Sequence, residues 1–203
     1  MTGKNATEVI AADAVGIARA ATILAGGGLV VVPTETVYGL AARADSPEAV
    51  ARIYAAKGRP DFNPLIVHVR DAKRGQRYAH VAGAALDMAE GEWPGSLTLV
   101  LPLRADAGLA PAVTAGLPTV ALRCPAHPVM RQLLEQVDFP LAAPSANRSG
   151  FISPTRPEHV LASLNGRIDM VLDGGPCAAG LESTIIAIRK DGGWDELRPG
   201  PVD

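Results

Sequence analysis

Short apolar runs, each bounded by proline, glycine or polar residues, constrain the fold of this chain more than any other feature of its sequence. The run 29–32 is rich in valine, follows three glycines and stops at Pro33, and similar runs occupy 65–69, 97–101 and 119–122. Runs of this length are typical of buried strands and are far too short to span a lipid bilayer. The sequence therefore predicts a sheet of short buried strands, and we expect no membrane-spanning segment.

Segments with helical spacing separate these strands in the first part of the chain. Residues 7–25 are rich in alanine and carry apolar side chains at helical intervals, while Ser46 and Pro47 are residue types that begin a helix, which Gly58 ends. Further helices are predicted at 81–90, 127–137 and 157–164, and further strands at 141–143, 168–172, 183–188 and 194–197. Helices alternate with strands early and strands dominate late, which favours an α/β domain with a mixed sheet over a regular doubly wound fold.

The composition fits one domain with an aliphatic core. Of 203 residues, 48% are hydrophobic but only 4% are aromatic, and glycine and proline are spread along the chain without a linker or repeat. The net charge of −2 excludes a chain that is basic throughout. Two cysteines, Cys124 and Cys177, exclude a disulfide scaffold and a four-cysteine zinc site. The first residues lack the pattern of a signal peptide, so we expect a single domain in the cytoplasm.

Two polar clusters follow predicted buried strands. The segment 33–40 contains Thr34, Glu35 and Thr36 directly after the first run, and polar loops at strand ends are where sheets bind ligands. The segment 143–150 is rich in small residues, which would let backbone N–H groups approach an anion. A hydroxyl-rich turn and an ordinary polar loop are the alternative interpretations of these two segments.

A third cluster, at the end of a predicted helix, combines two cations. Lys57 shares the inward face of its helix with Val50 and Ile53, where a lysine is unusual without an anionic partner. The glycine and proline on either side of Arg59 restrict its backbone. The pair is therefore a candidate site for a phosphate or carboxylate. The alternative is that both residues only complement the helix dipole.

Three smaller features also allow a functional and a structural interpretation. His68 alternates with valines in a predicted strand, which fits a core histidine as well as a site residue. Arg123 ends the run 119–122, where it would meet a ligand carboxylate or form a surface ion pair. The segment 57–77 is locally basic, which fits nucleic-acid contact or simply a solvated face. The histidines lack metal-binding spacing, and no Walker loop, dinucleotide-binding glycine motif or serine-nucleophile motif is present.

Six segments in order along the chain together carry a specific resemblance. They read GGLVVVPTETVYGLAARADSPEAVARIYAAKGRPDFNPLIVHV, WPGSLTLVLP, TVALRCPAH, PLAAPSANRSG, ESTII and LRPG. Over about residues 10–200 the chain resembles the YrdC-like family, the threonylcarbamoyl-AMP synthases of tRNA modification. The family's Lys-x-Arg and Ser-x-Asn signature corresponds to Lys57 and Arg59 with Ser145 and Asn147.

The resemblance implies a twisted mixed sheet around a wide, positively lined cavity and a single catalytic domain over 1–203, with no second C-terminal domain. It implies formation of L-threonylcarbamoyl-AMP from L-threonine, bicarbonate and ATP, with release of pyrophosphate, as the first step of t6A synthesis. Lys57 and Arg59 would be catalytic. The ATP side would be lined by Lys57, Arg59, Asn63, Thr119, Ser145, Asn147, Ser153 and Arg198. The threonine side would be lined by Thr34 or Thr36, by His68, Arg123 and Ser183, and by the backbone of Ala143.

The same resemblance implies partners and a metal. A downstream threonylcarbamoyl-transferase complex would take up the product, and we expect at most weak binding to tRNA and no membrane contact. Mg²⁺ would be held mainly through the ATP phosphates, because the sequence shows no dedicated carboxylate cage. Two alternatives stay open: a carbamoyl-adenylate-forming domain such as those of hydrogenase maturation proteins, and an RNA-binding module without catalysis.

Overall fold

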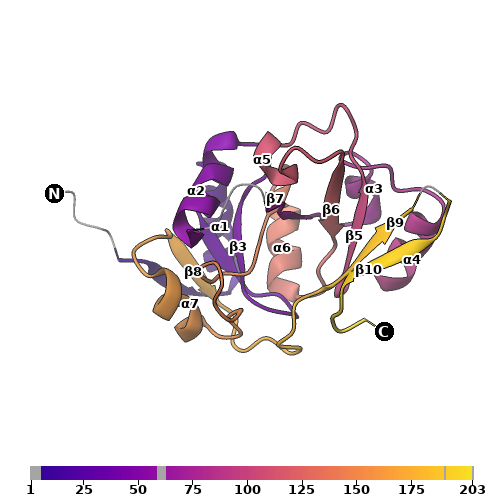
Figure 1. Cartoon of the computed structure of the whole chain (residues 1–203). Coiled ribbons are helices and arrows are strands. Elements are labelled where there is room, and N and C mark those ends of the chain that lie inside the picture. Colours follow the sequence, from indigo (N-terminus) through magenta and orange to yellow (C-terminus); the bar gives the residue numbers. More distant parts are fainter. Residues whose placement is uncertain (1–5, 59–62, 190, 203) are drawn as a thin grey trace.

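A mixed sheet runs through the whole molecule, with helices on both of its faces (Figure 1). The computed structural model describes residues 6–58, 63–189 and 191–202. Its strands are β1 (Glu8–Ala11), β2 (Val30–Val32), β3 (Gly39–Arg43), β4 (Ile66–His68), β5 (Leu97–Pro102), β6 (Thr119–Arg123), β7 (Leu141–Ala142), β8 (Met170–Asp173), β9 (Thr184–Ile188) and β10 (Trp194–Arg198). They lie in the order β1-β8-β2-β3-β7-β4-β6-β5-β9-β10, with parallel and antiparallel pairs in one sheet. The predicted α/β fold with a mixed sheet and flanking helices is confirmed.

The helices are α1 (Ala14–Ala25), α2 (Pro47–Lys57), α3 (Ala72–Gly75), α4 (Ala84–Glu92), α5 (Pro111–Thr114), α6 (Pro128–Gln136) and α7 (Pro157–Leu164). The start of α2 is as predicted: the Ser46 side chain accepts a hydrogen bond from the Ala49 N–H, and Pro47 is the first helical residue. Gly58 ends α2 with a φ of 57°, a left-handed conformation that costs glycine little. The helices in the described part of the chain are too short or too polar to cross a lipid bilayer.

The predicted start of the first helix, at residue 7, was wrong. Residues 8–11 form the edge strand β1 in parallel with β8, and α1 starts only after Asp13, whose side chain accepts a hydrogen bond of 2.8 Å from the Gly16 N–H. Val9 and Ile10 are β-branched and fit a strand. The alanine-rich composition of the following segment concealed the change of structure.

The sequence prediction also missed β3, which lies between β2 and β7 in the middle of the sheet. Glycine and alanine dominate β3, and both are poor strand formers. The strand is nevertheless buried on both faces, where its small side chains pack against the neighbouring elements. Tertiary packing therefore overrides local propensity. The two four-residue helices α3 and α5 were missed as well, since a single turn leaves no periodic pattern.

Two apolar clusters occupy the two faces of the sheet. On one face, α1 and α6 pack side chains such as Leu24 and Leu133 against Val30 and Val32 of β2. The other face is covered by a larger cluster, to which Val31 of β2 belongs. Among the described residues, no side chain of β4, β5, β6 or β9 joins the α1–α6 cluster. On that face, α1 and α6 therefore cover one half of the sheet and leave the other half without a helical cover.

Candidate functional site

The uncovered half of the sheet carries a row of site residues on four neighbouring strands. His68 of β4 is in register with Arg123 of β6, which pairs with Thr98 of β5, and Thr98 in turn pairs with Ile185 of β9. The residues next to them along the strands, such as Leu99 and Leu122, belong to the core on the opposite face. Because successive side chains of a strand point to opposite faces, the row faces away from that core.

A cavity of about 190 Å³ lies over this row. Its wall includes Pro64 and Leu65 before β4, the loop after β7, and Glu182 before β9. Seven residues singled out in the sequence line it together: Thr36, His68, Arg123, Ala143, Ser145, Ser183 and Arg198. Segments more than a hundred residues apart in the chain therefore meet at this cavity.

Arg123 is held by three side-chain hydrogen bonds and is only 4% exposed. Its Nη2 donates to Glu35 Oε1 at 2.5 Å, its Nη1 to Thr36 Oγ1 at 2.9 Å, and its Nε to the Gly95 carbonyl at 3.2 Å. Glu35 is itself fixed, because its Oε2 accepts the backbone N–H groups of Ala126 and His127 at the start of α6. Among the described residues, two of the five guanidinium N–H groups are left for a ligand.

The structure separates the two threonines that the sequence left undistinguished. Thr36 lines the cavity, whereas Thr34 does not. The Thr34 hydroxyl lies 2.8 Å from Thr36 Oγ1, donates to the Val37 carbonyl at 2.6 Å and accepts the Val37 N–H at 3.2 Å. Thr34 therefore stabilises the turn to Val37 and orients the Thr36 side chain, and the Thr36 hydroxyl lies at the cavity.

His68 is neutral at physiological pH. Its side chain is 2% exposed, and burial together with the positive charge of Arg123 lowers its pKa from 6.5 to about 3. Its Nδ1 has no hydrogen-bond partner among the described residues. A buried imidazole with an open polar atom at the cavity is available for a hydrogen bond to a ligand.

The buried neutral imidazole makes stability depend on pH. Unfolded His68 binds a proton below its ordinary pKa, about 6.5, whereas the folded protein does so only near 3. Because the unfolded state binds more protons between these values, the free energy of unfolding falls as the pH falls through this window, by at most about 1.4 kcal/mol per pH unit from this group.

We therefore expect His68→Gln to show a shallower loss of stability on acidification than the unsubstituted protein in urea unfolding across this window. His127, whose pKa burial also lowers, is present in both proteins and does not affect the comparison. The matched control is His80→Gln at an exposed position, which should follow the unsubstituted protein. Equal slopes for His68→Gln and the unsubstituted protein would contradict a neutral buried imidazole.

Arg198 also lines the cavity and forms a hydrogen-bonded cluster with the segment before β9. It makes an ion pair with Glu182, and it donates to the Ser183 carbonyl at 2.9 Å and to Ser183 Oγ at 3.0 Å. Burial alone would raise the pKa of Glu182, but hydrogen bonds from Ser153 and Ser145 and the charges of Arg198 and Lys57 outweigh it and lower the pKa. Glu182 is therefore ionised at neutral pH.

Lys57 is buried, as its position on the inward face of α2 predicted. Only 2% of the residue is exposed, and Nζ donates to the carbonyls of Ser145 and Asn147, the latter at 2.5 Å. The Asn147 side chain donates to the Phe151 carbonyl at 2.6 Å. In this structure Lys57 thus fixes the backbone of the loop whose Ser145 lines the cavity.

Several other predicted site residues do not line the cavity. Thr119 lies at the start of β6 opposite Pro102, the Asn63 carbonyl accepts the Tyr54 hydroxyl at 2.8 Å, and Ser153 reaches the site only through Glu182, at 2.6 Å. Thr34 contacts the cavity residue Thr36 by a hydrogen bond, and Lys57 binds the Asn147 carbonyl in the loop that carries Ser145. Arg59 lies outside the described residues.

The sequence analysis assigned no role to three residues that contact the cavity lining: Glu35, Thr98 and Glu182. Each lies next to a predicted residue in the chain or in the sheet, but their pairings depend on contacts between distant segments. Glu35 and Glu182 were detectable only as carboxylates within otherwise uncharged polar segments. The described residues contain no group of three or more metal-ligating side chains, and Cys124 and Cys177 are free thiols.

Comparisons with known proteins identify a matching family and related structures. The family model for Sua5, YciO and YrdC, with the description "Telomere recombination", matches residues 22–200. The threonylcarbamoyl-AMP synthase of Bacillus subtilis is 49% identical over 176 residues, which cover 86% of this chain and 51% of that protein. The chain thus spans about half the length of this curated relative.

Solved structures show the same fold. Pyrococcus abyssi Sua5 in complex with L-threonine superposes with a TM-score of 0.87 at 42% identity, over 96% of this chain and 56% of that one. Escherichia coli YciO superposes with a TM-score of 0.84 over 97% of this chain and 96% of that one, and at 24% identity it supports the fold alone. With the family model matching most of its length, the chain belongs to the Sua5/YciO/YrdC family.

Proposed function

We propose that this chain forms L-threonylcarbamoyl-AMP from L-threonine, bicarbonate and ATP, and that the product serves t6A synthesis in tRNA. The reaction releases one pyrophosphate and one water. The threonine nitrogen bonds to the carbon derived from bicarbonate, and a carbamate oxygen then attacks the α-phosphorus as the bond to pyrophosphate breaks. The proposal is supported by the relatives named threonylcarbamoyl-AMP synthase, such as that of Bacillus subtilis, of which the match to this chain covers 51%.

The observation that carries the proposal is the row of buried side chains on the cavity floor. Arg123 has two N–H groups left over, which suits two hydrogen bonds to a carboxylate. Thr36 and neutral His68 are available for the hydroxyl and amino groups of threonine. We therefore assign the amino acid to this end of the cavity, beside the Ala143 backbone.

The nucleotide is assigned to the end that holds Ser145 and Arg198. No covalent protein intermediate is needed, because the carbamate itself is the nucleophile. Catalysis then consists of orienting the reactants and stabilising charge on the α-phosphate and the leaving pyrophosphate. The buried ammonium of Lys57 contributes positive charge behind the loop, and Arg59 is proposed to act beside it. Mg²⁺ would be bound mainly by the phosphates, with Glu182 the only carboxylate of the described cavity wall.

Pyrophosphate release tests this proposal. With Mg-ATP, the protein should release pyrophosphate only when L-threonine and bicarbonate are both present, because the carbamate must form before α-phosphate attack. Release without threonine would contradict the proposal and favour a general ATPase, while use of carbamoyl phosphate in place of bicarbonate would favour the hydrogenase-maturation type of reaction. L-Serine is the matched control for the threonine methyl group, and product mass identifies the adenylate.

A further inference from the structure

Hydrogen-bond donors surround the carboxylate of Glu182, which is the one acidic group in the described wall of the cavity. Ser153 Oγ donates to its Oε1 at 2.6 Å, and Arg198 forms an ion pair with its Oε2. Ser145 adds a further hydrogen bond, and the positive charge of Lys57 acts on the same carboxylate. Two hydroxyls and two cations from three separate segments of the chain therefore converge on a single anion.

This set of donors suits a phosphate as well as it suits a carboxylate. Hydroxyl, guanidinium and ammonium groups bind the oxygens of either anion. The surroundings favour negative charge, because they lower the pKa of Glu182 although burial alone would raise it. The proposed function assigns the nucleotide to Ser145 and Arg198. A phosphate that approaches these two residues would find the Glu182 carboxylate in its place and would be repelled by its charge.

Arg198 has anchors that do not depend on Glu182. Its Nε donates to the Ser183 carbonyl at 2.9 Å, and its Nη2 donates to Ser183 Oγ at 3.0 Å. Ser183 is itself buried, and its hydroxyl lies 2.7 Å from the hydroxyl of the buried Thr98. If the carboxylate left, the guanidinium would therefore keep its place, and its Nη1 would be open to another acceptor.

Glu182, by contrast, has room to leave. Its side chain is 32% exposed, and it precedes β9 in a segment whose residues 178–181 are exposed. If the side chain turned toward solvent, its hydrogen bonds with Ser153 and Arg198 would be exchanged for hydrogen bonds with water, and the core would stay closed. Partly exposed ion pairs contribute little net stability, so a phosphate can compete with this one.

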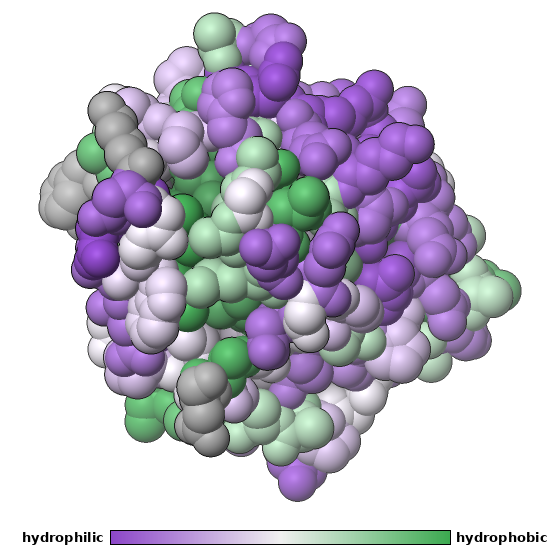
Figure 2. All heavy atoms as spheres, turned by 90° about the vertical axis from the view of Figure 1, so that its right-hand side faces the viewer, coloured by the Kyte–Doolittle hydropathy of each residue, from purple (hydrophilic) through white to green (hydrophobic). Residues whose placement is uncertain are grey.

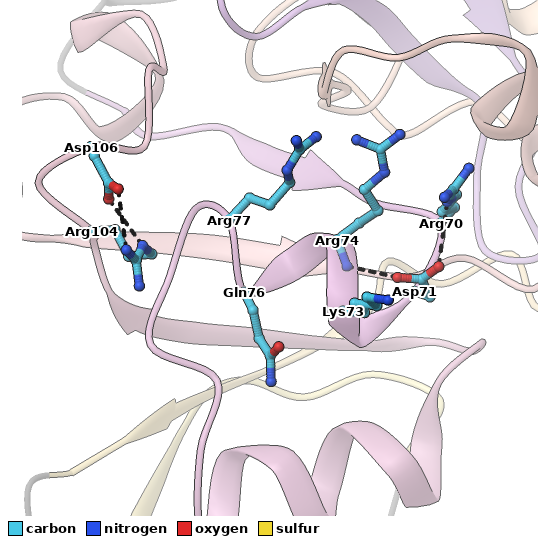
Figure 3. A pocket seen from close by; sticks show the side chains of 8 residues that line it. All are labelled: Arg70, Asp71, Lys73, Arg74, Gln76, Arg77, Arg104 and Asp106. Carbon is cyan, nitrogen blue, oxygen red and sulfur yellow. Dashed lines mark hydrogen bonds and ion pairs between the residues drawn. The ribbon is translucent and has the colours of Figure 1, made fainter.

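Cations elsewhere on the protein do without a carboxylate. A recess of about 830 Å³ beside α3 is lined by five of them: Arg70, Lys73, Arg74, Arg77 and Arg104. The exposed guanidinium of Arg77 makes no ion pair with the described residues around it (Figure 3). Hydrophilic residues also cover much of the molecular face in Figure 2. Water satisfies such exposed groups, whereas burial lowers the pKa of Arg198 and the Glu182 charge opposes that shift. The cation of the cavity therefore requires an anion.

We propose that Glu182 occupies a phosphate subsite of the cavity and that nucleotide phosphates bind by displacing its carboxylate from Arg198 and Ser153. The inference rests on the proposed function for the identity of the anion. Glu182 then sets the affinity for phosphates, because the apparent affinity is reduced by the fraction of molecules whose subsite the carboxylate holds. Return of the carboxylate to Arg198 would also favour the departure of pyrophosphate after the reaction.

Isothermal titration calorimetry with metal-free ATP and with inorganic pyrophosphate tests the displacement. Glu182→Gln keeps the shape of the side chain but removes its charge. Both ligands should bind this variant about tenfold more tightly, the order expected when one competing charge-assisted hydrogen bond is weakened. The matched control is Glu8→Gln, which removes the same charge from an exposed ion pair with Arg19 and should bind as the unsubstituted protein does. Unchanged or weaker binding by Glu182→Gln would overturn the inference.

Titration with Mg-ATP separates displacement from metal binding. If the carboxylate is displaced, Glu182→Gln should bind Mg-ATP and metal-free ATP more tightly alike. If Glu182 instead held the metal on the nucleotide, the variant would bind Mg-ATP more weakly and metal-free ATP as before, and the inference would be wrong. A lower melting temperature without tighter binding would show a purely structural role and would also contradict it.

A crystal structure of the unsubstituted protein with pyrophosphate gives a second test that needs no variant. We expect a phosphate oxygen at Arg198 Nη1 and the Glu182 carboxylate turned away from Ser153. An intact ion pair between Glu182 and Arg198 beside bound pyrophosphate would refute displacement.

These binding measurements need neither threonine nor bicarbonate nor turnover, so they fail independently of the proposed function. Tighter binding by Glu182→Gln, in a protein without threonine-dependent pyrophosphate release, would contradict the proposed function alone. Threonine-dependent release by the unsubstituted protein, with no change of affinity in the variant, would contradict the displacement alone.

Discussion

Lys57→Met is expected to lower the free energy of unfolding by about 2–6 kcal/mol and to remove most of the pyrophosphate release. Methionine keeps the apolar stem of the side chain but removes the ammonium that donates to the Ser145 and Asn147 carbonyls. Two carbonyls would then lose a charged donor in a buried place, and each such loss costs about 1–3 kcal/mol. The loop that carries Ser145 would lose its anchor at the same time.

Urea unfolding and pyrophosphate release measured on the same preparations test this expectation. The matched control is Lys73→Met, because Lys73 also lies in the last turn of a helix but is exposed. It should stay within about 0.5 kcal/mol of the unsubstituted protein. A Lys57→Met protein that is as stable as the control and yet inactive would show that the ammonium acts on the substrate alone. Normal turnover with reduced stability would leave it a purely structural role.

Arg123→Ala is expected to raise the Michaelis constant for threonine by between about thirtyfold and several thousandfold. A buried carboxylate that loses a charge-assisted partner loses about 2–5 kcal/mol of binding, and each 1.4 kcal/mol is about tenfold. The Michaelis constant for ATP should change little, because the proposal assigns the nucleotide to Ser145 and Arg198 and not to Arg123.

Among the described residues, removal of Arg123 also leaves Glu35 with only the backbone N–H groups of Ala126 and His127 as partners. Glu35→Gln/Arg123→Ala therefore serves as a companion that removes the uncompensated charge: it should recover part of the stability without recovering threonine affinity. The control Arg52→Ala breaks an exposed ion pair far from the cavity and should leave both Michaelis constants unchanged. A collapse of ATP affinity with normal threonine affinity would reverse the assignment of the two ends.

Local pattern was sufficient to predict most of the strands and the ends of α2. It failed where neighbours in space decide the structure: β3 is a strand because a small-residue segment is needed between β2 and β7, although its residues favour no strand. Likewise, residues 8–11 form a strand because β8 offers a free edge.

The same limit applies to the site. Sequence reasoning found seven of the side chains that line the cavity, because they lie at strand ends or in motifs that carry a family resemblance. It did not find Glu35 as the partner of Arg123, nor the Ser145 and Asn147 carbonyls as acceptors for the Lys57 ammonium. Such pairings depend on segments about ninety residues apart, and no local spacing encodes them.

Leu122 and Arg123 are neighbours in β6 and point to opposite faces of the sheet, so the pairing register of this strand decides both the core packing and the cavity lining. Leu122 packs in the core, and Arg123 lines the cavity. If β6 paired one residue out of step, the guanidinium would enter the core and the leucine would take its place at the ligand. A mispaired molecule would thus be both unstable and inactive. In this half of the sheet, selection for a stable protein and selection for a working site act on the same register.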